Sequence, residues 1–140
     1  MYQLRGKLSI VMPAYNEEAL IYNSIMQTLS IVEQFAPDLE IIAVNDGSKD
    51  KTKQEIERAI RDDAKQPHPV VPGMRVSGTR IKLVTSNKNR GKGNAIISGI
   101  SQAEGNYIAF VDADLELNPA QLEGYLKKMQ ESGSDVVIGC

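Results

Sequence analysis

Apolar and polar positions alternate in blocks along the chain, and the period within each block predicts its secondary structure. Short, nearly continuous apolar runs have the length of buried strands; they occupy 7–12, 39–45, 80–86, 107–111 and 135–139. Between them, apolar side chains recur every three or four positions, as in helices that bury one face; these segments are 18–35, 51–64, 94–104 and 119–131. The chain therefore alternates strand and helix.

Each predicted helix has an apolar stripe that we expect to face a core. The stripe residues are Ile21, Ile25, Leu29 and Val32, then Ile56 and Ile60, then Ile96, Ile97 and Ile100, and finally Leu122, Tyr125, Leu126 and Met129. Every position of 107–111 is hydrophobic, so we expect this strand to be buried on both faces. Asn16, Asp50 and Asn118 are the expected N-caps of three helices, with Pro119 at the first helical position of the last.

Strand–helix alternation indicates an α/β fold, a mostly parallel sheet with helices on both faces. We find no internal repeat or boundary and expect residues 1–140 to form a single domain. The segment 65–79 has three prolines and two glycines, which predicts a long surface loop without an assigned role. Ligands of such sheets bind outside the carboxyl ends of the strands. Four polar turns fall there: "PAYNEE", "NDGSKD", "NKNRGKG" and "DADLELNP".

Three carboxylates follow the strand at 107–111 within five residues: Asp112, Asp114 and Glu116. Asp112 and Asp114 repel each other unless a positive charge lies beside them. Mg²⁺ or Mn²⁺ is the natural partner, because hard cations prefer oxygen ligands. The spacing alone leaves open a solvated acidic loop that suits a helix N-terminus. Asp46 ends another strand level with this cluster, where its carboxylate can accept hydrogen bonds from a nucleobase.

The glycine-bearing turn "RGKG" fits neither nucleotide-binding glycine motif. A Walker motif needs glycine in place of Ser86 and serine or threonine in place of Gly93. A dinucleotide fingerprint needs a small residue in place of Ile96 and belongs after the first strand. The turn is therefore typical of a flexible helix start, although Arg90 and Lys92 can reach an anion.

Composition narrows the classes of function. The 140 residues are 41% hydrophobic and 24% charged with a net charge of −2, which is enough for one core and gives no basic excess for nucleic-acid binding. The single cysteine, Cys140, excludes an internal disulfide framework and favours a reducing compartment. No apolar run approaches the roughly 20 residues of a membrane span.

Taken together, the four turns resemble the family-two glycosyltransferases, which have the Rossmann-like, nucleotide-sugar-binding fold called GT-A. "IVMPAYNEE" is similar to the family's first-strand signature, and "VNDGSKDKT" to its second-strand motif. "NRGKGNAIISGISQAEGNYIAFVDADLELNP" is similar to the stretch that leads into its Asp-x-Asp (DXD) motif. The likeness covers roughly 7–139. "DADLELNP" and "DVVIG" are closest to the polyprenyl- or dolichyl-phosphate sugar (mannosyl or glucosyl) transferases.

The resemblance implies roles for particular residues. The nucleotide-sugar-binding set is Pro13, Ala14, Tyr15, Glu17, Val44, Asp46, Asp112, Ala113 and Asp114, and the metal ligands are Asp114, Glu116 and Asp112. Three features depart from the family pattern. Asn45 stands where an aspartate is frequent, Glu116 stands where glutamine or a small polar residue is frequent, and the 65–79 loop is longer than usual.

The resemblance also implies a reaction, in which a sugar passes with inversion from a GDP- or UDP-linked donor to a polyprenyl or dolichyl phosphate. A saccharide acceptor, a non-catalytic nucleotide-binding module and a plain structural domain are the alternatives. In the family, the base and the acceptor-binding residues lie beyond the fifth strand. We therefore expect an N-terminal part of a catalytic domain that binds donor and metal, with little transfer alone. The expected location is the cytoplasm, or the cytoplasmic face of a membrane reached through the acceptor.

Overall fold

A computed structural model describes residues 2–72 and 78–136. Its strands are β1 (Leu8–Ala14), β2 (Leu39–Asp46), β3 (Ile81–Ser86) and β4 (Tyr107–Phe110). Its helices are α1 (Ile21–Val32), α2 (Thr52–Ala64), α3 (Lys92–Gln102) and α4 (Gln121–Ser132). Strand and helix alternate as the sequence predicts, and no described helix is long and apolar enough to cross a membrane. The strand expected at 135–139 lies largely outside the described residues.

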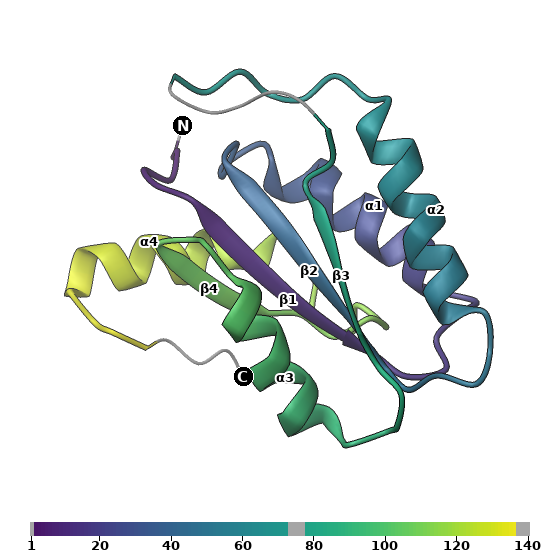
Figure 1. Ribbon diagram of the computed structural model, residues 1–140. Helices are drawn as coiled ribbons and strands as arrows, with labels where there is room; N and C mark the ends of the chain where they lie inside the picture. The colour runs from purple at the N-terminus through teal and green to yellow at the C-terminus, as the bar shows by residue number, and fades with distance from the viewer. Residues whose placement is uncertain (1, 73–77, 137–140) are drawn as a thin grey trace.

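The sheet has the order β3-β2-β1-β4, and each neighbouring pair is parallel. Side chains of β1 and β2 alternate between two cores, because successive residues of a strand point to opposite faces. The larger core joins the sheet to α1, α2 and α4, and the smaller one lies under α3. Figure 1 shows α3 on one side of the sheet, opposite α1 and α2. The expected α/β architecture, with helices on both faces, is confirmed.

The buried side of α3 differs from the prediction. Ala95 and Gly99 face the sheet, whereas Ile97 is 67% exposed and Ile100 is 38% exposed. A Cβ atom at position 99 would overlap the side chain of Val11. The helix therefore lies close to the sheet through its small residues, and close approach leaves no room beneath it for the isoleucine stripe.

Strand β4 is not buried on both faces, which corrects a second prediction. Ile108 and Phe110 are 43% and 49% exposed. Among the described strands, β4 pairs with β1 alone, so it lies at the edge of that sheet. In the register, Phe110 pairs with Val11 and so lies on the α3 face. A continuous apolar run therefore does not ensure burial of both faces.

The N-cap positions are Lys51 in α2 and Ala120 in α4, so the predicted caps Asp50 and Asn118 are wrong by one and two residues. Both side chains nevertheless bond to amides at the helix starts. The Asp50 carboxylate accepts a hydrogen bond from the Thr52 amide at 2.9 Å, and the Asn118 side chain accepts one from the Ala120 amide at 2.9 Å. Asn16 is not a cap. It has a left-handed backbone with φ of 52°, and α1 begins only at Ile21.

The described ends of the 65–79 loop are held by one buried carboxylate. Asp63 is fully buried at the end of α2, and its Oδ2 accepts a 2.8 Å hydrogen bond from the Arg80 amide. The Arg80 guanidinium lies 2.8 Å from Asp63 Oδ1, and His68 Nε2 lies 3.3 Å from the same oxygen. Burial alone would raise the pKa of Asp63, but the Arg80 contacts outweigh it and lower that pKa. The loop thus has anchored ends beside β3.

Candidate functional site

A cavity of about 370 Å³ opens at the carboxyl ends of the strands. Every member of the predicted nucleotide-sugar set except Val44 lines it, and the further lining residues are Asn89, Gly91, Lys92 and Ala95. The four predicted turns therefore meet at one place, because the carboxyl ends of parallel strands share one edge of the sheet. Val44 is excluded by its depth in the sheet, since it lies two residues before the strand end. Val44 points to the α3 side, is 1% exposed and packs beneath Ala95 in the smaller core.

The first and second turns are hydrogen-bonded to each other. The Asn16 amide donates to the Ser48 hydroxyl at 3.0 Å, and the Asn16 side-chain oxygen accepts from the Lys49 amide at 2.9 Å. The Glu17 amide donates to the Thr52 hydroxyl at 2.8 Å. These bonds explain why Asn16 does not cap α1. They fix the wall of the cavity that carries Tyr15, whose side chain is 40% exposed.

Asp46 holds the third turn in place. Its Oδ1 accepts a hydrogen bond from the Arg90 amide at 2.9 Å, and its Oδ2 accepts one from the Gly91 amide at 3.0 Å. The residue is 4% exposed and lies on the same strand face as Val44, one step nearer the cavity. Its predicted contact with a nucleobase therefore depends on lone pairs that these two amides leave free, since each carboxylate oxygen can accept two hydrogen bonds.

Gly47, next in the chain, brings the second turn against the third. Its φ is 70°, and a Cβ atom there would overlap the backbone of Lys88 and Asn89. A side chain would be strained by both the left-handed backbone and the contact. The path of the third turn, and hence the start of α3, depends on this glycine and on Asp46.

The fourth turn presents Asp112 and Asp114 to the cavity and directs Glu116 away from it. Leu115 has a left-handed backbone with φ of 53°, and the Glu116 amide donates back to Asp114 Oδ1 at 3.1 Å. This bend breaks the alternation that would have aligned all three acids. On the side of the turn that faces the core, the buried Ser24 hydroxyl of α1 donates a short hydrogen bond to the Ala113 carbonyl and fixes the turn.

The cavity is acidic. Its lining includes the carboxylates of Glu17, Asp46, Asp112 and Asp114. Burial raises the pKa of Glu17, and the negative charges of Asp114 and then Asp50 raise it further. Lys92 Nζ lies 2.5 Å from Asp112 Oδ1 at the rim. Asp114 and Glu17 thus lie near enough to repel each other, and a bound cation would relieve that repulsion.

The expected set of three metal ligands is not assembled. Among the described residues, no three acidic, histidine or cysteine side chains converge closely enough to hold a metal ion. Asp112 and Asp114 both reach the cavity, but Glu116 does not line it. Magnesium-type sites commonly use only one or two protein carboxylates and take their other ligands from water and substrate phosphate. Asp112 and Asp114 therefore fit a divalent cation that is completed by a bound ligand.

The sequence predicted that the third turn lies at this edge of the sheet, but the predicted binding set contains no residue of that turn or of α3. Asn89 and Ala95 carried no recognisable chemical signal. Lys92 was noted for its reach toward an anion together with Arg90, yet Lys92 lines the cavity and Arg90 does not. The signal that could have found Lys92 is its position at the first residue of a helix after a strand.

Residues 9–140 match the family described as "Glycosyl transferase family 2", and the chain is a member of that family. One relative, the undecaprenyl-phosphate 4-deoxy-4-formamido-L-arabinose transferase of Enterobacter sp. (strain 638), is 34% identical over 131 residues. The match covers 94% of this chain and 36% of that relative. The chain therefore spans about a third of the length of the curated relatives it matches.

Solved structures confirm the GT-A fold. The mannosyltransferase PcManGT of Pyrobaculum calidifontis, in complex with GDP-Man and Mn²⁺, has a TM-score of 0.70 and 23% identity over 90% of this chain and 33% of its own. TarS 1–349 of S. aureus, in complex with UDP-GlcNAc, has a TM-score of 0.64 and 26% identity over 92% of this chain and 32% of its own. At such identities the likeness concerns architecture.

Proposed function

We propose that this chain binds the nucleotide-diphosphate sugar of an inverting glycosyltransferase together with Mg²⁺ or Mn²⁺. The observation that carries the proposal is the meeting of the four predicted turns around one cavity that Asp112 and Asp114 both reach. We further propose that the sugar passes to a polyprenyl phosphate. As first predicted, residues 1–140 would form one domain that serves the donor half of this reaction.

The diphosphate of the donor is the leaving group, and its charge grows as the glycosidic bond breaks. A divalent cation held by Asp112 and Asp114 would supply charge neutralisation at those oxygens. Without a cation, the same carboxylates would repel the diphosphate. The acidic lining therefore favours nucleotide binding that depends on a metal ion. The proposal of a metal rests on this chemistry of the Asp112 and Asp114 carboxylates.

The nucleoside would occupy the wall formed by the first two turns. Tyr15 offers an exposed aromatic ring, and Pro13 and Ala14 offer an apolar edge. Asp46 has lone pairs left to accept from a base N–H group. Uracil and guanine both carry such a group, so a UDP-linked and a GDP-linked donor both fit the proposal.

The acceptor is inferred from relatives named as undecaprenyl-phosphate sugar transferases. A lipid phosphate is ionised at neutral pH and can attack the anomeric carbon without a strong general base. A saccharide hydroxyl would need a carboxylate base. A lipid acceptor would also place the working enzyme at a membrane surface, on the cytoplasmic side where nucleotide sugars are the donors.

Calorimetric titration tests the donor site. GDP, UDP and their sugar conjugates are titrated with and without Mn²⁺ into the wild-type chain, the Asp114→Asn variant and the Glu116→Gln variant. Asp114→Asn keeps the acceptor for the Glu116 amide and removes only the charge. Glu116→Gln removes the same charge from the same turn, outside the cavity.

We expect metal-dependent binding of one nucleotide, weakened about 100-fold by Asp114→Asn and unchanged by Glu116→Gln. Equal weakening by both variants would mean that the net charge of the turn, and not the cavity, governs binding. Metal-independent binding, or none, would contradict the proposal.

A further inference from the structure

Lys92 lines the acidic cavity at its rim and is paired with one of the two candidate metal ligands. It is the first residue of α3, and its Nζ lies 2.5 Å from Asp112 Oδ1. The Lys92 side chain is 61% exposed and that of Asp112 is 54% exposed, so the pair sits at the rim. The ammonium group therefore contacts a carboxylate that is also a candidate ligand for a divalent cation.

The pair is not required to hold α3 in place. The start of the helix is fixed by the two hydrogen bonds from the third turn to Asp46. The body of the helix packs against the sheet through Ala95 and Gly99. An ion pair as exposed as Lys92–Asp112 contributes little to folding. A purely structural role therefore leaves the position of Lys92 in the cavity unexplained.

Lys92 is the only basic side chain among the described residues that line the cavity, alongside four carboxylates. An anionic diphosphate entering this site needs positive partners that the acids do not provide. Two cations cannot both hold Asp112 Oδ1 at full strength, because each would repel the other. Metal binding at Asp112 would free the Lys92 ammonium and its three hydrogen-bond donors.

We propose that Lys92 is an exchangeable internal counter-ion. It neutralises Asp112 while no metal is bound, and it turns to the donor diphosphate when a divalent cation takes Asp112. This inference rests on the proposed donor function and adds a specific diphosphate-binding residue to it. It predicts that one substitution has opposite effects on two ligands, which a structural role would not produce.

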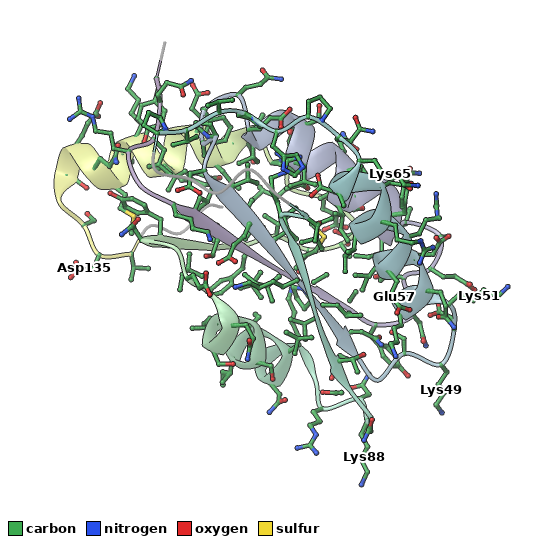
Figure 2. All side chains as sticks on the ribbon, turned by 45° about the horizontal axis from the view of Figure 1, so that its top comes forward. Lys49, Lys51, Glu57, Lys65, Lys88 and Asp135 are labelled. Carbon is green, nitrogen blue, oxygen red and sulfur yellow. The ribbon has the colours of Figure 1, made fainter. Side chains whose placement is uncertain are left out.

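The test compares Lys92→Gln with Lys88→Gln. Both changes remove one positive charge and keep an aliphatic stem. Lys88 belongs to the same turn but lies outside the cavity lining, and Figure 2 shows it pointing away from the fold. Two affinities are measured for each protein: that for Mn²⁺ alone, by the paramagnetic resonance signal of free Mn²⁺, and that for UDP and GDP at saturating Mn²⁺, by calorimetry.

For Lys92→Gln we expect Mn²⁺ alone to bind about threefold tighter, because its competitor is gone. We expect the nucleoside diphosphate to bind about tenfold weaker, because a charge-assisted hydrogen bond is lost. Lys88→Gln should change neither affinity by more than about twofold. Lys92→Arg, which keeps the charge, should restore most of the diphosphate affinity.

Three results would overturn the inference. If Lys92→Gln leaves both affinities at the wild-type values while the wild type binds Mn²⁺ and nucleotide, Lys92 is a surface ion pair and the donor site stands without it. If both affinities fall together, Lys92 supports the shape of the site and not the diphosphate. If the wild type binds no nucleotide, the donor function fails and this inference fails with it.

Discussion

Acidic side chains cluster at both ends of the sheet, but the two clusters have opposite surroundings. At the amino end, Glu40 of β2 has a side chain that is 4% exposed and lies 2.9 Å from Lys82 Nζ and 3.9 Å from Lys7 Nζ. The Ser9 hydroxyl donates to it at 2.6 Å, and the Glu104 amide at 2.7 Å. Burial alone would raise the pKa of Glu40, but these partners outweigh it and lower that pKa.

At the carboxyl end, four acids line one cavity with Lys92 as the described basic partner. The pKa of Glu17 is raised there, first by burial and then by Asp114 and Asp50. Charges that only support the fold are satisfied by other residues of the fold. Charges left in mutual repulsion in a cavity are those that a ligand can satisfy. The difference between the ends therefore separates structural acids such as Glu40 from candidate functional ones such as Glu17 and Asp114.

The largest change in stability should come from a substitution that disturbs the backbone of the second turn, at the carboxyl end of the sheet. Gly47→Ala forces a left-handed alanine, about 1–2 kcal/mol, and overlaps the Lys88 backbone, about 1–3 kcal/mol. We expect a loss of about 4 kcal/mol of unfolding free energy in urea titrations. Gly124→Ala in α4 is the control, since a Cβ there meets nothing within 4 Å. It should gain up to about 1 kcal/mol, and an equal loss at both sites would contradict the account.

The next largest loss of stability should come from removing the buried charge of Glu40 at the amino end of the sheet. Glu40→Ala leaves the Ser9 hydroxyl and the Glu104 amide without their acceptor and leaves Lys82 without its buried partner. We expect a loss of about 3 kcal/mol. Glu104→Gln removes a carboxylate that is 69% exposed in the same cluster and should change stability by less than about 0.5 kcal/mol. Similar losses from both variants would show that burial is not the deciding property.

A smaller loss of stability should appear when acid protonates Glu40. The folded pKa of Glu40 lies below the usual value of 4.5. Its contribution to stability is therefore complete above that pH and is lost as pH falls through the lowered pKa. Urea titrations of the wild type and Glu40→Gln below pH 4.5 should show a shallower acid loss for the variant. Parallel curves would mean that Glu40 does not carry this dependence.

The smallest effect should have the opposite sign and lie at the carboxyl end. Glu17→Gln removes one of the mutually repelling carboxylates, so we expect a gain of about 0.3 kcal/mol after allowance for solvent screening. The gain should shrink in high salt, since salt screens repulsion at the rim. A loss of stability, unaffected by salt, would show that Glu17 is a satisfied structural acid like Glu40.

The sequence predicted which turns form the site, because the rule for parallel sheets brings strand ends together whatever the details of the helices. Asp46, Asp112 and Asp114 follow directly from where their strands end. The failures are local or tertiary. The left-handed conformation of Leu115, which excludes Glu116, has no signature in residue type, since leucine rarely adopts it.

The prediction chose the wrong face of α3. Hydrophobicity alone places the isoleucines against the sheet, whereas the close approach of helix and sheet requires the small residues Ala95 and Gly99 there. The Lys92–Asp112 pair joins residues of different elements, and only their positions in space reveal it. Asp46 was predicted only in part. Its place at the cavity was predicted from the sequence, but its two bonds to the third turn were not.

The most direct test of the donor site is a crystal grown with Mn²⁺ and a nucleoside diphosphate, with anomalous diffraction used to locate the metal. The account predicts one Mn²⁺ peak in contact with Asp112 and Asp114, the diphosphate beside it, and Lys92 moved off Asp112. A peak at the Glu40 cluster, or nucleotide bound outside the cavity, would contradict it.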